Sequence, residues 1–80
     1  MRIIDKKCYP LYFQSVLKDE KRFELRKDVD GVQVGDVMRL REWNPDSMEY
    51  TGRFVEVPVR YVLRNVPHFG LMPGYCVIGF

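Results

Sequence analysis

The segment KRFELR, which begins at Lys21, surrounds one carboxylate with three cationic side chains. Side chains two residues apart in a β-strand point to the same face, so Glu24 shares a face with Arg22 and Arg26 and can bridge them. Lysine and arginine side chains held by a carboxylate can bind an anionic or polar ligand. Arginine in particular recognises phosphate through two parallel hydrogen bonds.

The same alternation assigns the other face of this strand to the core. Phe23 and Leu25 are expected to be buried there, while Lys21, at the start of the strand, can reach either face. The competing hypothesis is a solvated strand face whose surface ion pairs contribute about 0–1 kcal/mol each. Spacing alone does not decide between a ligand site and such a face.

A second carboxylate falls among apolar residues in the following strand. Glu42 has the same parity as Met38 and Leu40 in the predicted strand 37–43, so it lies at the end of the apolar face. A carboxylate in that position is costly unless it is paired. Lys21 or Arg26 is the expected partner; alternatively, the parity breaks near Trp43 and Glu42 is released to solvent.

The pattern of apolar residues predicts a mainly β fold that positions these charges. The apolar stripe after Pro10 predicts a short amphipathic helix that ends near Lys18. Pro58 is expected to bend one long strand, and Gly52 to form a hairpin turn within Tyr50–Arg53. The predicted strands lie near residues 3–4, 22–26, 37–43, 53–63 and 75–80, and the predicted turns and loops lie at 28–35, 44–47 and 65–74. We expect four to six strands in a small β-barrel with one flanking helix, because closure removes exposed edges.

Composition places the chain in a broad class of protein. Its 80 residues predict one domain, 1–80, and its 46% hydrophobic residues are enough for a core. The net charge of +2 permits nucleic-acid binding but does not demand it. Cys8 and Cys76 are expected to be buried structural thiols, and His68 an idle loop residue. We expect a cytoplasmic monomer with no metal, no cofactor and no membrane segment.

Several motifs resemble one known family. Lys21-x-x-Glu24-x-Arg26, followed by VGD at 34–36 and then Glu42, resembles the signature of the ASCH domains in the PUA-like superfamily. The fuller pattern of FELRKD, VGDVMRLREW, EYTGR and GYCVIGF is closer still to a small phage and bacterial branch without an established function. The resemblance covers about residues 7–80.

The resemblance implies a PUA-like barrel with a cleft between the helix and the barrel mouth. It also implies that RNA or a modified nucleoside is the ligand, and that Lys21, Glu24 and Arg26 are the cleft residues. The turn at Gly35-Asp36 would shape the wall beside them. Asp19 departs from the family pattern, which has a glycine two residues before the lysine.

The resemblance also suggests an enzymatic alternative. One relative is a small amidohydrolase that deacetylates acetylcytidine, and its threonine nucleophile stands three residues after the lysine, where this chain has Glu24. A carboxylate is a poor replacement for that nucleophile, although it can act as a general base. If the protein is a hydrolase of a modified nucleoside or of RNA, Lys21 and Glu24 would be its catalytic residues.

The resulting expectation is a small RNA-binding or nucleotide-binding module with a charged cleft. Glu42 would hold the basic side chains, Arg53 would contact phosphate, and Trp43 would either stack on a base or cap the core. A further alternative is a phage accessory protein that binds a host protein. That alternative predicts an exposed apolar patch, for example over Phe69–Met72.

Overall fold

Six strands, one α-helix and one short 3₁₀ turn form a mostly β structure, and the computed structural model describes residues 1–80. No helix is long and apolar enough to cross a membrane. Every predicted strand segment overlaps an observed strand, and the helix is confirmed to within one residue. The elements are β1 (Ile3–Cys8), α1 (Pro10–Leu17), β2 (Phe23–Lys27), β3 (Val37–Asn44), β4 (Glu49–Pro58), β5 (Tyr61–Leu63), η1 (Pro67–Phe69) and β6 (Tyr75–Gly79).

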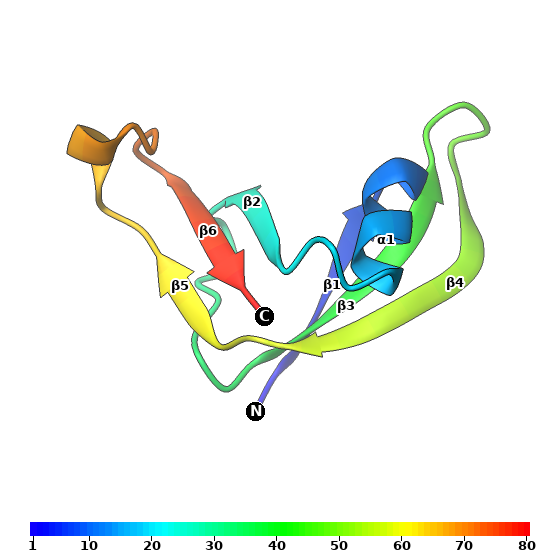
Figure 1. Cartoon of the computed structure of the whole chain (residues 1–80), viewed down its shortest axis with the longest axis horizontal. Helices are drawn as coiled ribbons and strands as arrows, with labels where there is room; N and C mark the ends of the chain where they lie inside the picture. Colours follow the sequence, from blue (N-terminus) through cyan, green and yellow to red (C-terminus); the bar gives the residue numbers. More distant parts are fainter.

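The strands form two three-stranded sheets. Sheet A has the order β1-β3-β4 and sheet B the order β2-β6-β5. Strands β1 and β3 are parallel, and all other neighbours are antiparallel. In Figure 1, sheet B lies on the left and sheet A on the right, and the chain passes from β4 to β5 at the bottom. The sheets do not close into one barrel, because β1 and β2 lie at free edges and share no backbone hydrogen bond.

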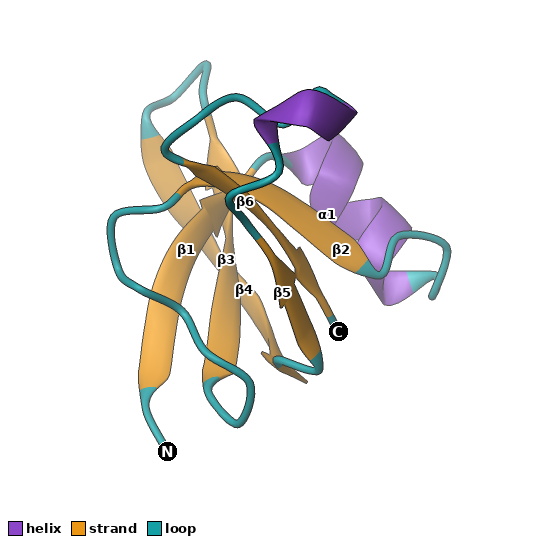
Figure 2. Ribbon diagram, turned by 90° about the vertical axis from the view of Figure 1, so that its left-hand side faces the viewer, coloured by secondary structure: helices purple, strands orange, loops and turns teal.

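The helix follows β1 directly and contacts β3 of sheet A; it is the longer purple element on the right of Figure 2. Pro10 occupies its first turn, where the missing N–H has no partner to lose. Phe13 and Val16 are the buried residues of α1. After the helix, Asp19 adopts a positive φ of 62°, and the chain turns into β2. Lys21 therefore stands at the junction between the helix and sheet B.

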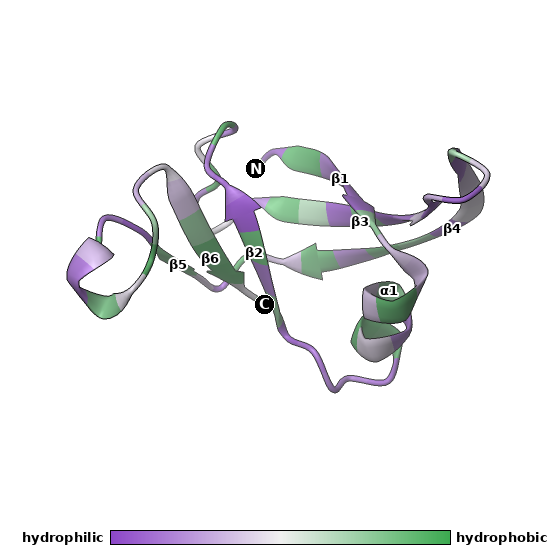
Figure 3. Cartoon of the chain, turned by 90° about the horizontal axis from the view of Figure 1, so that it is seen from above, coloured by the Kyte–Doolittle hydropathy of each residue, from purple (hydrophilic) through white to green (hydrophobic).

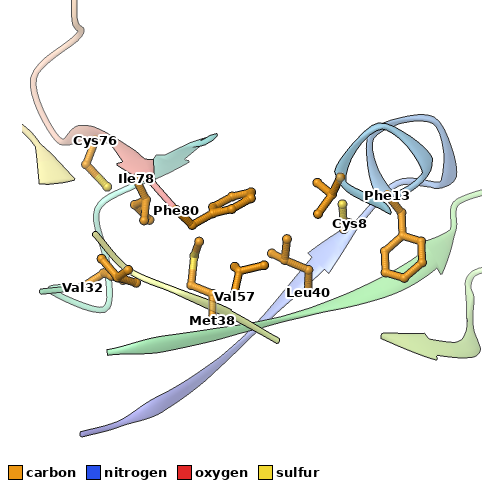
Figure 4. Close-up of a cluster of buried hydrophobic side chains, with 11 residues drawn as sticks. Cys8, Phe13, Val32, Met38, Leu40, Val57, Cys76, Ile78 and Phe80 are labelled. Atoms are coloured by element: carbon orange, nitrogen blue, oxygen red, sulfur yellow. The ribbon is translucent and has the colours of Figure 1, made fainter. Parts of the chain in front are cut away.

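The core lies between the two sheets. Figure 4 shows Ile78 and Phe80 pointing from sheet B toward Met38 and Val57 of sheet A. The side chains of Met38, Leu40 and Ile78 are 0% exposed. Both cysteines are free thiols within this core, as expected for small buried hydrophobic residues.

The connection between β2 and β3 is held against sheet A by Arg2. Its guanidinium bonds Asp36 at 2.9 Å and the backbone carbonyl of Gly31 at 3.0 Å. Arg64 bonds the connection from the other side, through Asp28 and the Val32 carbonyl. These contacts confirm that the segment is an ordered turn region rather than a strand.

The predicted strand 53–63 is interrupted at Pro58, where a bend was predicted, and it begins earlier than predicted. It is divided after Pro58, because Val59 donates its N–H to the carbonyl of Asp36, just before β3 of sheet A, whereas Arg60 donates to the Gly79 carbonyl of sheet B. In addition, β4 begins at Glu49, so the predicted turn Tyr50–Arg53 is part of a strand. The positive φ of Gly52, 95°, accompanies a register shift opposite Arg41/Trp43, which is a β-bulge.

The predicted facing of β2 is reversed. Phe23 and Leu25 are 50% and 59% exposed, whereas Glu24 is only 5% exposed. Directly opposed residues of an antiparallel pair share a face, and Glu24 lies opposite the fully buried Ile78. The core residues of β6 therefore set the facing of β2, and its own apolar residues point outward. Figure 3 shows the green, hydrophobic stretches of β5 and β6 beside β2, which mixes green and purple.

This packing predicts different costs for one substitution at two positions. Ile78→Val should lower the free energy of unfolding by about 0.5–1.5 kcal/mol, because it removes a methylene from a filled site. Ile3→Val, at a position that is 49% exposed, should change it by less than about 0.5 kcal/mol. Urea unfolding followed by circular dichroism measures both values. Equal losses would contradict the assignment of Ile78 to the core.

Candidate functional site

Glu24 is the centre of a partly buried ion cluster. Its Oε1 accepts a hydrogen bond from Lys21 Nζ at 2.5 Å, and its Oε2 accepts one from Arg26 Nε at 2.9 Å. The three side chains are 6%, 17% and 25% exposed for Glu24, Lys21 and Arg26. The structure thus brings the three predicted cleft residues together, and we call them the Glu24 cluster.

The expected bridge to Arg22 is not formed. The Arg22 guanidinium bonds Asp19 instead, on the solvent side of the helix–strand junction. Lys21 takes its place beside the carboxylate and also donates to the Phe23 carbonyl at 2.8 Å. The reversed facing of β2 does not explain this exchange, because Arg22 would have the same parity as Glu24. Instead, β2 begins only at Phe23, so Arg22 lies outside the strand and does not follow its alternation.

Arg26 joins the two sheets at their open side. Its Nη2 donates to the backbone carbonyl of Lys7, near the end of β1. Since β1 and β2 share no backbone hydrogen bond, this side-chain contact spans the gap between their edges. The position of Arg26 is therefore fixed from two directions, by Glu24 and by β1.

A pocket of about 560 Å³ lies at this open side. One wall comes from β1 and α1, and the other from β2 with the residues before it. Aromatic rings contribute to both walls, and Lys21 Nζ lies 5.6 Å from the Tyr12 ring centroid and 5.2 Å from that of Phe23. The lining residues of this pocket, which we call the Glu24 pocket, are Lys7, Cys8, Tyr9, Tyr12, Lys21, Phe23, Glu24, Leu25 and Arg26.

The thiol of Cys8 is part of the pocket wall, but it is not activated. The pKa of Cys8 is raised to about 11, mainly by burial and next by the negative charge of Glu24, while Lys21 and Arg26 each lower it by less. The thiol is therefore protonated at neutral pH, whereas a nucleophilic cysteine requires the thiolate. Nucleophilic catalysis by Cys8 is disfavoured on this ground.

The free hydrogen-bonding groups in the pocket are mainly donors. Lys21 uses two of its three N–H groups, on Glu24 and Phe23, and Arg26 directs Nε and Nη2 to protein acceptors. One lysine N–H and the Nη1 group of Arg26 are left for a ligand. Both carboxylate oxygens of Glu24 already accept from cations. The pocket is thus suited to an acceptor group, such as a phosphate or a carbonyl oxygen, beside a flat ring.

Glu42 forms a separate buried ion pair. Its carboxylate accepts two hydrogen bonds from Arg53, each 2.9 Å long, and one of 2.7 Å from the Thr51 hydroxyl. The prediction that Lys21 or Arg26 would pair with Glu42 is wrong. The bulge at Gly52 places Arg53 beside Glu42 within sheet A, so the carboxylate is satisfied by its neighbouring strand.

The pairing changes the titration of Glu42. The hydrogen bonds from Arg53, followed by that from Thr51, lower the pKa of Glu42 below its ordinary value. The same pairing raises the pKa of Arg53. Arg53 is nevertheless 53% exposed as a side chain, so part of its guanidinium stays accessible for a phosphate contact.

Trp43 does not itself line the Glu24 pocket. Lys7 Nζ stands 4.0 Å from the centroid of its ring, and Tyr50 meets it edge-on with centroids 4.9 Å apart. Trp43 is half-buried and belongs to the face of sheet A that points away from the core, so it does not cap the core. His68 is exposed in η1 and does not line the pocket.

Sequence reasoning missed six residues that line the Glu24 pocket. Phe23 and Leu25 were expected in the core, and the other four lie at the junction of β1 and α1: Lys7, Cys8, Tyr9 and Tyr12. A local signal existed, since the pattern of a strand followed by Tyr-Pro and a helix places this junction at one end of sheet A. Its position opposite β2 depends on how the sheets meet, which no local pattern indicates. No group of three or more His, Cys, Asp or Glu side chains has an arrangement that could hold a metal ion.

One family model matches the chain, over residues 4–80, and its description is a domain of unknown function, DUF3850. No curated protein matches the chain.

The Glu42 pair predicts a specific response to acid. In the folded protein the pKa of Glu42 is lowered. Below about pH 4.5, Glu42 is therefore protonated in the unfolded chain while it is still ionised in the folded protein. The stabilisation is complete above that pH and is lost as the pH falls through the folded-state pKa. Glu42→Gln should therefore be less stable than wild type near neutral pH, and should lose less stability on acidification.

Urea unfolding at about pH 7 and about pH 3 measures this difference. The matched control is Glu49→Gln, which removes an exposed glutamate of the same strand pair that makes no ion pair. A Glu42→Gln protein that loses as much stability as wild type between the two pH values would contradict the prediction.

Proposed function

Because the chain belongs to the DUF3850 family, whose function is unknown, we propose a function from the site itself: the domain binds RNA or a nucleotide in the Glu24 pocket. The observation that carries the proposal is a buried carboxylate that holds two cations between aromatic walls. The volume of about 560 Å³ lies within the range of roughly 300–1,000 Å³ typical of small-molecule sites. Phosphate, base carbonyl and base ring each have a matching group in the pocket.

We assign the roles of the cluster from its free groups. Arg26 and Lys21 contact a phosphate or the carbonyl edge of a base, because each has an N–H group left over. Glu24 orients both cations, since its two oxygens already accept from them. Tyr12 and Phe23 provide ring faces for stacking, a contact worth about 1–3 kcal/mol per base in single-strand binders.

The strand arrangement supports the PUA-like assignment that the sequence motifs imply. Sheet A continues into sheet B through the β4–β5 connection, so the strands follow the order β1-β3-β4-β5-β6-β2 around the core. In this proposal the two sheets are an opened barrel, and the Glu24 pocket is the cleft at its opening beside α1. The resemblance and the pocket then point to the same ligand class.

A hydrolase remains the alternative that the same pocket allows. Lys21 and Glu24 would be its catalytic pair, acting on a modified nucleoside or on RNA. The geometry favours binding over catalysis, because Lys21 and Arg26 both occupy the Glu24 oxygens that a general base needs free. Product formation separates the two functions.

Exposed apolar side chains favour protein binding as the second candidate function. Phe69 and Met72 are 78% and 65% exposed, in the region where that alternative predicts a patch. Leu25 and Tyr61 add a second exposed apolar area on the outer face of sheet B. A partner lost on Tyr61→Lys, together with an absence of RNA binding, would favour this function.

The proposal predicts the effect of removing Arg26. Arg26→Ala should weaken binding of a labelled single-stranded RNA pool roughly 10- to 100-fold, because hydrogen bonds to charged groups contribute about 1.5–3 kcal/mol. Binding of the wild type should weaken as salt rises, since phosphate contacts release counterions. Fluorescence anisotropy at low and moderate salt measures both effects.

The matched control is Arg22→Ala, which removes an arginine that bonds Asp19 outside the pocket. Circular dichroism melting of both variants identifies any loss of fold, and Arg26→Lys tests the pocket with the charge retained. Equal affinity of wild type and Arg26→Ala for RNA would sink the proposal. RNA cleavage or deacylation that disappears in Glu24→Gln would instead establish the hydrolase.

A further inference from the structure

The outer face of sheet A has three cations placed over three aromatic rings. Lys7 Nζ lies 4.0 Å from the Trp43 ring centroid, and Arg41 Cζ lies 3.8 Å from that of Tyr50. A longer contact of 5.7 Å joins the next pair along the sheet, Arg39 and Phe54. We call these six residues the outer ladder.

The register of the strands makes the outer ladder continuous. Lys7 of β1 lies opposite Arg41 of β3, which lies opposite Phe54 of β4. One step along the same face, Trp43 lies opposite Tyr50. The residues of the outer ladder are therefore neighbours on one face across all three strands, and they do not form isolated pairs.

Positive charge is unbalanced at one end of the outer ladder. Arg39 is matched by two carboxylates, Asp5 at 3.6 Å and Glu56 at 3.0 Å. Lys7 and Arg41, in contrast, take part in none of the ion pairs of the protein. Their end of the sheet thus presents two cations without a protein anion, stacked on rings that keep them in place.

A hollow of about 420 Å³ lies within this surface. It is bounded by four residues of the outer ladder, Arg39, Arg41, Tyr50 and Phe54, together with Gly52 and Arg53. Gly52 leaves its part of the hollow open, because a Cβ atom there would meet nothing within 4 Å. Arg39, Arg41 and two aromatic rings therefore line a space that an acidic group can enter, whereas the Arg53 guanidinium is held by Glu42.

The outer ladder is continuous with the Glu24 pocket at Lys7. This residue lines the pocket, and its ammonium group also lies over the Trp43 ring. Strand β1 is the free edge of sheet A that faces the pocket. An extended ligand in the pocket can thus pass over β1 to the outer face and stay in contact with cationic side chains along this path.

We propose that the outer ladder is a second contact surface for single-stranded RNA, which continues from the Glu24 pocket across β1. Lys7 and Arg41 bind successive phosphates, while Tyr50, Phe54 and the plane of Arg41 stack against bases. The RNA assignment rests on the proposed function, since the pocket defines the ligand class. The natural ligand on this account is an oligonucleotide and not a free nucleotide.

The test compares ligands of different length. A mixture of the ribonucleoside monophosphates and a series of labelled oligouridylates are titrated into wild type, Arg41→Gln and Phe54→Leu. Arg41→Gln should leave mononucleotide affinity within about 2-fold, weaken the longer oligonucleotides about 10-fold, and reduce the salt slope by about 0.7, the value for one phosphate contact on a single strand. Phe54→Leu should weaken long oligonucleotides roughly 5- to 100-fold.

The matched control is Arg60→Gln, which removes an exposed, unpaired arginine between the sheets and should leave all affinities unchanged. Mononucleotide binding with no gain from length would overturn the outer ladder while leaving the Glu24 pocket intact. Length-dependent binding that is lost in Arg41→Gln but not in Arg26→Ala would support the ladder and reject the pocket. Displacement of RNA by polyglutamate of equal charge as readily as by oligouridylate would overturn the RNA assignment.

Discussion

The burial of the Glu24 carboxylate is the constraint on which the rest of this structure depends. A carboxylate in the interior is tolerated only with close partners, and here Lys21 and Arg26 supply them. Once Glu24 faces inward, Phe23 must face outward, and Arg26 is directed to the Lys7 carbonyl of β1. The open side of the protein, its pocket and the exposed face of sheet B all follow from this one orientation.

The two buried glutamates differ in how many N–H groups of their partners stay free of protein acceptors. Glu42 is satisfied by a two-pronged contact from Arg53 and by Thr51, a closed arrangement that suits a structural role. Glu24 instead divides its oxygens between two cations, each of which retains free N–H groups toward the pocket. The same residue type thus joins two strands at one position and orients two cations beside a pocket at the other.

Local signals were enough to predict the helix after Pro10, the turn after Asn44 and the approximate position of every strand. They also brought Lys21, Glu24 and Arg26 together as candidates. The facing of β2 could not be predicted, because it is set by Ile78 of β6, which lies far away in the sequence. The partner of Glu42 was missed for a related reason, since a bulge at Gly52 decides where Arg53 points.

The outward apolar side chains of β2 have a consequence for solubility. Strand β2 lies at the edge of sheet B, and an edge strand can pair with another chain and begin aggregation. The exposed side chain of Leu25 in this strand would favour that contact. The charges of Lys21 and Arg26 stand at this edge, while the opposite edge, β5, is only three residues long. Lys21 and Arg26 therefore line the pocket and also oppose pairing of β2 with a strand of another chain. A chain without these charges would form intermolecular sheet more readily.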